Sequence, residues 1–185
     1  MQYMKIILIG IQGSGKSTQG NLLSEKLSIP YLSSGHIFRE MAKEKTPMGR
    51  YIKETMNAGY LISDEKTLEI VQEYLGRDEY NKGYILDGFP RTVPQAEQFQ
   101  NGITAAVYLR VTDKEALWRL AGRDDEGVRE DNNLKAIMKR INLFHEKTEP
   151  VIEFYRNKGK IIDIDGEMPI EEINNKIMDE LSKRS

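Results

Sequence analysis

The sequence predicts an α/β protein with a parallel sheet covered by helices on both faces. Apolar runs that end at turn residues recur along the 185 residues, at 5–9, 83–86, 105–111 and 160–164, with a weaker run at 30–32. Segments with helical spacing alternate with these runs, which is typical of parallel sheets. Apolarity is continuous rather than alternating in 6–9 and 105–109, which predicts strands buried from both sides. We therefore expect five strands in a three-layer arrangement.

The expected helices cover residues 15–27, 36–45, 48–58, 64–75, 93–99, 113–123, 134–157 and 169–181. Asp113 and Ser63 are predicted N-caps, because short polar side chains at these points can accept hydrogen bonds from the first helical turn. Pro150 lacks the N–H that a helix interior requires, so a kink or a break is expected near residues 148–150.

The three helical segments between the second and third strands form too long an excursion for a simple crossover. We interpret residues 34–76 as a lobe over the carboxyl ends of the strands, where open α/β sheets bind ligands. A chain of 185 residues suits one buried core, so a single domain over 1–185 is expected.

The glycine-rich turn after the first strand, GIQGSGKST at 10–18, carries the clearest chemical signal. Its glycines permit positive φ, so that backbone N–H groups can converge on a phosphate at the start of a helix. Lys16 adds a full positive charge, and Ser17 or Thr18 offers a hydroxyl to phosphate or Mg²⁺. The alternative, a tight turn with a surface lysine, does not explain the whole pattern. The motif predicts nucleotide triphosphate binding.

Composition excludes several other classes of protein. The 27 basic and 29 acidic residues give a net charge of −2, so no overall field attracts nucleic acid or a membrane. The absence of cysteine excludes disulfides and Cys-ligated zinc. The two histidines, His36 and His145, are far apart in sequence, so we expect no metal site built on histidines. We expect the first residues to form a core strand rather than a signal sequence, and no apolar run is long enough to span a membrane. We expect a cytoplasmic monomer that is an enzyme or a switch.

A carboxylate follows the apolar strand at 84–86. In phosphate-loop proteins an Asp at this place holds Mg²⁺ or its waters, so Asp87 and Ser17 are candidate metal ligands, directly or through water. The alternative is an Asp that merely initiates a turn before Gly88.

The string that starts at this carboxylate, DGFPR at 87–91, resembles the adenylate kinase family of nucleoside-monophosphate kinases. Further strings in matching order extend the resemblance over nearly the whole chain: LSSGHIFR at 32–39, GYLISD at 59–64, RLAGR at 119–123, Arg129, Arg140, TEP at 148–150 and DG at 165–166.

The resemblance implies a three-layer phosphate-loop fold and reversible Mg²⁺-dependent phosphoryl transfer from ATP to AMP, giving two ADP. It implies an AMP-binding lobe at 34–76, a core at 1–33, 77–122 and 133–185, and a lid at 123–132. Only residues 124–128 separate Arg123 from Arg129, as in short-lid members, which carry no zinc. The expected partners are ATP, AMP and ADP.

The resemblance also assigns site residues. The residues that it assigns to ATP binding are Gly13, Ser14, Gly15, Lys16, Ser17, Thr18, Arg119, Arg123 and Met168. The residues that it assigns to AMP binding are Ser34, Gly35, Arg39, Tyr60, Leu61, Ile62, Gly88, Arg91, Gln95, Arg129 and Arg140. The catalytic group would be Lys16, Arg91, Arg123, Arg129 and Arg140.

The chemistry fits such a set of residues. A monophosphate has a second pKa near 6, so its oxygen is already an anionic nucleophile and no general base is needed. Arginines grip phosphate oxygens bidentately and neutralise the transferring group, although a lone arginine usually lies on a solvated helix face. The amide of Gln95 can both donate to and accept from adenine, unless it simply faces solvent.

The sequence departs from the family pattern at Gln12, Ser17, Ser34 and His36. Two other readings stay open. One is a kinase of the same class that phosphorylates UMP, CMP or another monophosphate. The other is a nucleotide-gated switch or binding module, although the base-reading motif of GTPases is missing.

Overall fold

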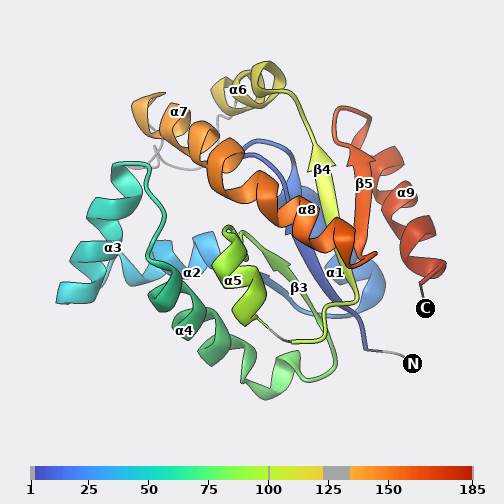
Figure 1. Ribbon diagram of the computed structural model, residues 1–185, viewed down its shortest axis with the longest axis horizontal. Helices are drawn as coiled ribbons and strands as arrows, with labels where there is room; N and C mark the ends of the chain where they lie inside the picture. Colours follow the sequence, from blue (N-terminus) through green and yellow to red (C-terminus); the bar gives the residue numbers. More distant parts are fainter. Residues whose placement is uncertain (1–2, 100, 123–133, 185) are drawn as a thin grey trace.

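The computed structural model describes residues 3–99, 101–122 and 134–184, which form a five-stranded sheet between layers of helices (Figure 1). The strands are β1 (Lys5–Ile9), β2 (Tyr31–Ser33), β3 (Tyr84–Asp87), β4 (Ala105–Arg110) and β5 (Ile161–Asp165). All neighbouring strands pair in parallel, in the order β2-β3-β1-β4-β5. The predicted parallel sheet of five strands is confirmed.

The two faces of β1 explain its continuous apolarity. Ile6 and Leu8 point to one face, where they join the buried side chains of α1 (Lys16–Leu27) and α9 (Ile170–Ser182). Ile7 points to the opposite face and packs in a separate cluster under the remaining helices. Because each face is covered, every second residue of this strand is as well buried as its neighbours.

The opposite face is covered by the helices that follow β3 and β4. They are α5 (Val93–Gln98), α6 (Asp113–Ala121), α7 (Leu134–Leu143) and α8 (Glu149–Asn157). Figure 1 shows α7 and α8 as one long rod that crosses the sheet. Within the described ranges, no helix is long and apolar enough to cross a membrane.

The expected interruption of this long rod is a π-helical turn over Phe144–Thr148. Pro150 is the second residue of α8, which follows the π turn, and its missing N–H there removes no bond from a regular helix interior. The chain thus accommodates Pro150 by widening the preceding turn rather than by separating two helices with a loop.

The excursion between β2 and β3 is helical. It contains α2 (Ser34–Met41), α3 (Pro47–Asn57), α4 (Asp64–Leu75) and a short 3₁₀ turn at Asp78–Tyr80, and Figure 1 shows α2, α3 and α4 grouped at one side of the sheet. The first of these helices was predicted at 36–45 but ends earlier, at Met41. It also starts earlier, because Ser33 caps it by accepting from His36 N at 3.3 Å. Ser63 caps α4 as predicted, accepting from Lys66 N.

The predicted cap at Asp113 is wrong. Thr112 has the extended backbone of a cap, and its hydroxyl accepts from Glu115 N at 3.3 Å. Asp113 is therefore the first helical residue, where its charge still favours the positive end of the helix dipole. Two adjacent polar residues can each serve as a cap, and the local sequence alone does not decide between them.

The turn before β3 provides a test of the packing at the start of two neighbouring strands, β3 and β1. Gly83 has φ +106°, and a Cβ built on it would lie 2.3 Å from the carbonyl oxygen of Met4. Gly102 also has positive φ (+64°), but no atom lies within 4 Å of its Cβ position. We expect Gly83→Ala to lower the free energy of unfolding by more than about 2 kcal/mol and Gly102→Ala by about 1 kcal/mol. Urea unfolding of both variants measures the difference, and equal losses would contradict the described contact.

Candidate functional site

A cavity of about 370 Å³ lies at the carboxyl ends of β1 and β3. The register pairs Leu8 with Asp87, so the loops that follow these two strands are neighbours. The predicted site residues that line this cavity are Gly13, Gly15, Lys16, Ser17, Thr18, Gly35, Arg39, Tyr60, Leu61, Ile62, Asp87, Gly88, Arg91, Gln95 and Arg140. The structure thus brings together residues that are up to 127 positions apart in the sequence, from Gly13 to Arg140.

Other predicted residues lie beside the cavity or outside the described part of the chain. Ser34 is buried next to Gly88, and its hydroxyl has no hydrogen-bond partner among the described residues. Ser14 is buried in the glycine-rich loop. Arg123, Arg129 and the whole predicted lid at 123–132 fall outside the described residues.

The glycine-rich loop makes a tight turn that requires glycine at two positions. Gly13 and Gly15 have φ values of +91° and +92°, and a Cβ on Gly13 would lie 2.7 Å from the carbonyl oxygen of Ala116. Helix α1 begins at Lys16, so its first N–H groups border the cavity. Lys16 Nζ donates to the carbonyl oxygens of Gly10 at 2.8 Å and Ile11 at 2.9 Å. The loop therefore holds an ammonium group and a helix N-terminus at one place.

Asp87 is a nearly buried carboxylate at the end of β3, only 5% exposed. Its Oδ2 accepts from Tyr31 OH at 2.7 Å and from Ser17 Oγ at 3.4 Å. Burial, and then the charge of Asp87, raise the pKa of Tyr31, so this hydroxyl stays protonated and donates. The carboxylate and the Ser17 hydroxyl are hard oxygen ligands of the kind that Mg²⁺ prefers.

No group of three or more His, Cys, Asp or Glu residues comes together as a metal site in the part of the chain that the structure describes. Mg²⁺ ordinarily needs only one or two carboxylates when the phosphates of a nucleotide supply the remaining ligands. The pair of Asp87 and Ser17 therefore fits a metal that arrives with its nucleotide better than a permanently held ion.

Three arginines gather on the other side of the cavity. Arg91 is half-buried and donates from Nε to the carbonyl oxygen of Gly88 at 2.7 Å. Burial lowers its pKa, Asp87 opposes this, and the positive charges of Arg140 and Arg39 lower it further. The guanidinium group of arginine is cationic in proteins, so these three side chains concentrate positive charge beside the cavity. Like charges held together next to a cavity indicate a site for a polyanion.

Arg140 connects three elements across the cavity. From α7 it donates to Gln12 Oε1 at 3.3 Å and to the carbonyl oxygen of Met56 at 2.9 Å. Met56 lies in the last turn of α3, and its carbonyl oxygen also accepts from the backbone N–H of Gly59 at 2.9 Å. Gln12, a departure from the family pattern in the sequence, thus links the glycine-rich loop to the arginine cluster.

Gln95 is buried, so the alternative in which it faces solvent is wrong. The residue is only 2% exposed, and its Oε1 accepts from the backbone N–H of Arg91 at 2.7 Å. Its Nε2 donates to Asp64 Oδ1 at 2.8 Å, and Thr92 Oγ1 donates to the same oxygen at 2.9 Å. A buried amide with these partners has a defined orientation at the cavity wall.

Two polar residues beside Gln95 and Arg91 were not assigned to the site from the sequence. Asp64 and Thr148 belong to strings that resemble the family, at 59–64 and 148–150, but neither was given a site role of its own. The hydroxyl of Thr148 donates to the carbonyl oxygen of Arg91 at 2.9 Å. Both contacts join distant segments, and short polar residues near a helix end gave no signal that distinguishes them from ordinary caps.

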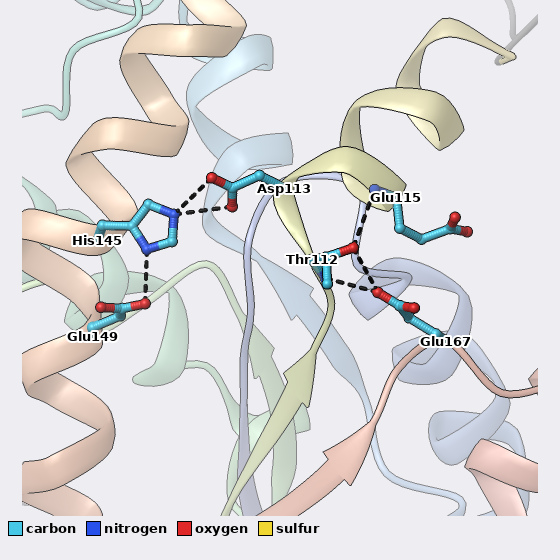
Figure 2. A network of polar contacts seen from close by, with 6 residues as sticks. All are labelled: Thr112, Asp113, Glu115, His145, Glu149 and Glu167. Atoms are coloured by element: carbon cyan, nitrogen blue, oxygen red, sulfur yellow. Dashed lines mark hydrogen bonds and ion pairs between the residues drawn. The ribbon is translucent and has the colours of Figure 1, made fainter.

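Arg119 and Met168 do not line the cavity. Arg119 donates to the carbonyl oxygen of Gly166 at 2.9 Å and pairs with Glu115 at 2.7 Å. Glu167 accepts from both the N–H and the hydroxyl of Thr112, at 2.9 and 2.8 Å (Figure 2). These bonds fasten the start of α6 to the turn between β5 and α9.

His145 fastens the same helix from the opposite direction. Figure 2 shows its ring between Asp113, at 2.9 Å, and Glu149, at 2.7 Å. The hydrogen bond to Glu149, together with the weaker effect of Asp113, raises the pKa of His145. The imidazolium form therefore clamps α6 to the π turn and α8.

The comparisons with known proteins agree with one another. The family model described as "Adenylate kinase" matches residues 8–160. An adenylate kinase of Azobacteroides pseudotrichonymphae is 40% identical over 96% of this chain and 97% of its own. Those of Syntrophotalea carbinolica and Ruminiclostridium cellulolyticum are 37% and 35% identical, over 96% and 95% of this chain and 98% of each of theirs.

The clamp at His145 predicts a pH dependence of stability. A pKa that is raised on folding stabilises the protein fully below the ordinary histidine pKa of about 6.5, and the effect is lost as pH rises through the raised value. The side chain is 42% exposed, so solvent limits the gain to at most about 1 kcal/mol.

Urea unfolding of the wild type and His145→Gln between pH 5.5 and 9 tests this effect. We expect the wild type to be the more stable at the acidic end and the difference to shrink as pH rises. His36→Gln serves as the control for loss of an exposed histidine. A difference that is constant or grows with pH would contradict the clamp.

Proposed function

The chain belongs to the adenylate kinase family, and we propose that its cavity aligns ATP and AMP for phosphoryl transfer that yields two ADP. One observation carries the proposal: a phosphate loop with Lys16 and a cluster of Arg39, Arg91 and Arg140 border the same cavity. Two polyanions can be neutralised there at once, which is the main requirement of phosphoryl transfer.

On the donor side we assign the ATP phosphates to the loop at 13–18. The backbone N–H groups and Lys16 would neutralise the phosphate oxygens. Arg119 and Met168 lie near the Gly166 turn, where the resemblance places the ATP base, and Arg123 completes the assigned donor set. Asp87 and Ser17 would hold Mg²⁺ with the nucleotide, and the ion supplies further charge neutralisation at the transferring group.

On the acceptor side we assign the AMP phosphate to Arg39 and Arg91 and its base to Gln95. Ser34 and Gly35 would border the phosphate, and the segment 60–62 would border the base. The monophosphate oxygen is already anionic at neutral pH, so these residues position and neutralise rather than remove a proton. The role of the buried Gln95 amide is to pair with the adenine edge.

Between the two nucleotides we assign Arg140 and Arg129 to the transferring phosphoryl group. Water competes with AMP as acceptor, so the site must close before transfer. We assign closure to the lobe at 34–76 and the lid at 123–132, which move against a core of 1–33, 77–122 and 133–185. We further propose that a single chain is the working unit.

The first experiment is an assay of ADP formation from ATP and Mg²⁺ with AMP, CMP, UMP or GMP as the acceptor. We expect transfer to AMP to exceed transfer to the others. A preference for a pyrimidine monophosphate would contradict AMP as the acceptor but keep the phosphoryl transfer. ATP binding without transfer to any acceptor would favour a nucleotide-gated switch or binding module.

Substitution of Arg91 tests the acceptor site. We expect Arg91→Ala to lower kcat/KM for AMP by about 10²–10³-fold, because it removes a guanidinium from a preorganised cavity. ATP affinity, measured by calorimetry, should change less than about threefold, since the phosphate loop is intact. Arg50→Ala, which removes an exposed arginine from α3, is the matched control and should leave both quantities unchanged. A parallel loss of ATP binding in Arg91→Ala would contradict the assignment.

A further inference from the structure

The contact between Gln95 and Asp64 joins two parts of the chain that are 31 residues apart. Asp64 is the first residue of α4, in the lobe, and Gln95 belongs to α5, on the core. We propose that Asp64 is a positioning residue that locks the Gln95 amide in the orientation that selects a 6-amino over a 6-oxo purine monophosphate. This inference rests on the proposed function and adds to it a residue that sets base selectivity.

The orientation of the Gln95 amide follows from the chemistry of its two neighbours. The backbone N–H of Arg91 only donates, so the amide atom 2.7 Å away from it must be the oxygen. An ionised carboxylate only accepts, so the amide atom 2.8 Å from Asp64 Oδ1 must be the nitrogen. Both neighbours demand the same orientation, and a flipped amide would lose two hydrogen bonds and create two repulsive contacts.

The locked amide leaves one donor and one acceptor position for a ligand. A glutamine amide has two of each, and the bonds to Arg91 and Asp64 use one acceptor and one donor position. The remaining N–H and the remaining lone pair can pair with N1 and the 6-amino group of adenine. Hypoxanthine has the inverse pattern at these positions, with a protonated N1 and a 6-oxo group. A rotatable glutamine could satisfy either base by flipping, whereas the locked one satisfies only adenine.

The carboxylate of Asp64 is available for this task because it does not cap its own helix. Ser63 caps α4. Thr92, which caps α5, donates its hydroxyl to the same Asp64 oxygen at 2.9 Å and so holds the carboxylate in place. Gln95 is 2% exposed, so water does not replace a lost partner easily.

The test compares AMP with inosine monophosphate, which differs only in the 6-oxo group and the proton on N1. We expect Asp64→Ala to lower the ratio of kcat/KM for AMP to that for inosine monophosphate by about tenfold, the effect of one charge-assisted hydrogen bond. The two constants should move in opposite directions, AMP down and inosine monophosphate up. Asp64→Asn keeps an oxygen that can accept and should retain more of the selectivity.

Glu65→Ala removes the neighbouring acid in the same helical turn and should leave the ratio unchanged. If the role of Asp64 is merely structural, Asp64→Ala lowers kcat/KM for both acceptors in parallel and the ratio does not change. That result, in a variant that still phosphorylates AMP, would overturn this inference but not the proposed function. A wild type that transfers to neither acceptor would instead overturn the proposed function, and this inference with it.

A measurement on the wild type covers the case in which Asp64→Ala does not fold. In ¹⁵N-edited NMR spectra, the side-chain amide protons of Gln95 should exchange with solvent far more slowly than those of Gln98, an exposed glutamine on the same helix. Exchange as fast as that of Gln98 would show that the amide is not locked and would overturn the inference.

Discussion

The rest of the site depends on the concentration of positive charge around one cavity. Lys16, Arg39, Arg91 and Arg140 surround a space that also contains the buried Asp87. Like charges this close repel one another, and a partly desolvated guanidinium is costly unless it is hydrogen-bonded. The protein meets this cost with backbone carbonyl oxygens, which accept from Lys16, Arg91 and Arg140. A pair of nucleotides would relieve the repulsion, so the strain within the site itself favours polyanion binding.

The sheet explains why this charge can be held in place. β1 and β3 are parallel neighbours, so the phosphate loop and Asp87 leave the sheet at the same edge. Both faces of the sheet are buried, which fixes the direction of each strand end. The helices around this edge are then fastened to one another by polar bonds, such as those of His145 and of Glu167 in Figure 2. A rigid frame thus supports side chains that must meet two different substrates.

Local sequence patterns predicted the frame well and the contacts between distant segments poorly. The strands, the phosphate loop and the position of Asp87 follow from apolar runs and motif spacing. The convergence of Arg39, Arg91 and Arg140 was inferred from family resemblance, because no periodicity indicates which helix faces which cavity. Thr112 rather than Asp113 caps α6, since neighbouring polar residues compete for one role. Gln12, Gln95 and Thr148 bond to Arg140, Asp64 and Arg91, respectively. Each of these partners is more than 30 residues away in the sequence, so no local pattern predicts the contact.

The central claim is that one cavity holds two nucleotides whose phosphate chains meet. The most direct measurement is a calorimetric titration with a bisubstrate in which a polyphosphate chain joins two adenosines. We predict one molecule bound per chain, with an affinity at least about a hundredfold above that of ATP, because both halves bind as one ligand. Binding no tighter than that of ATP alone, or two molecules per chain, would contradict a shared cavity for donor and acceptor.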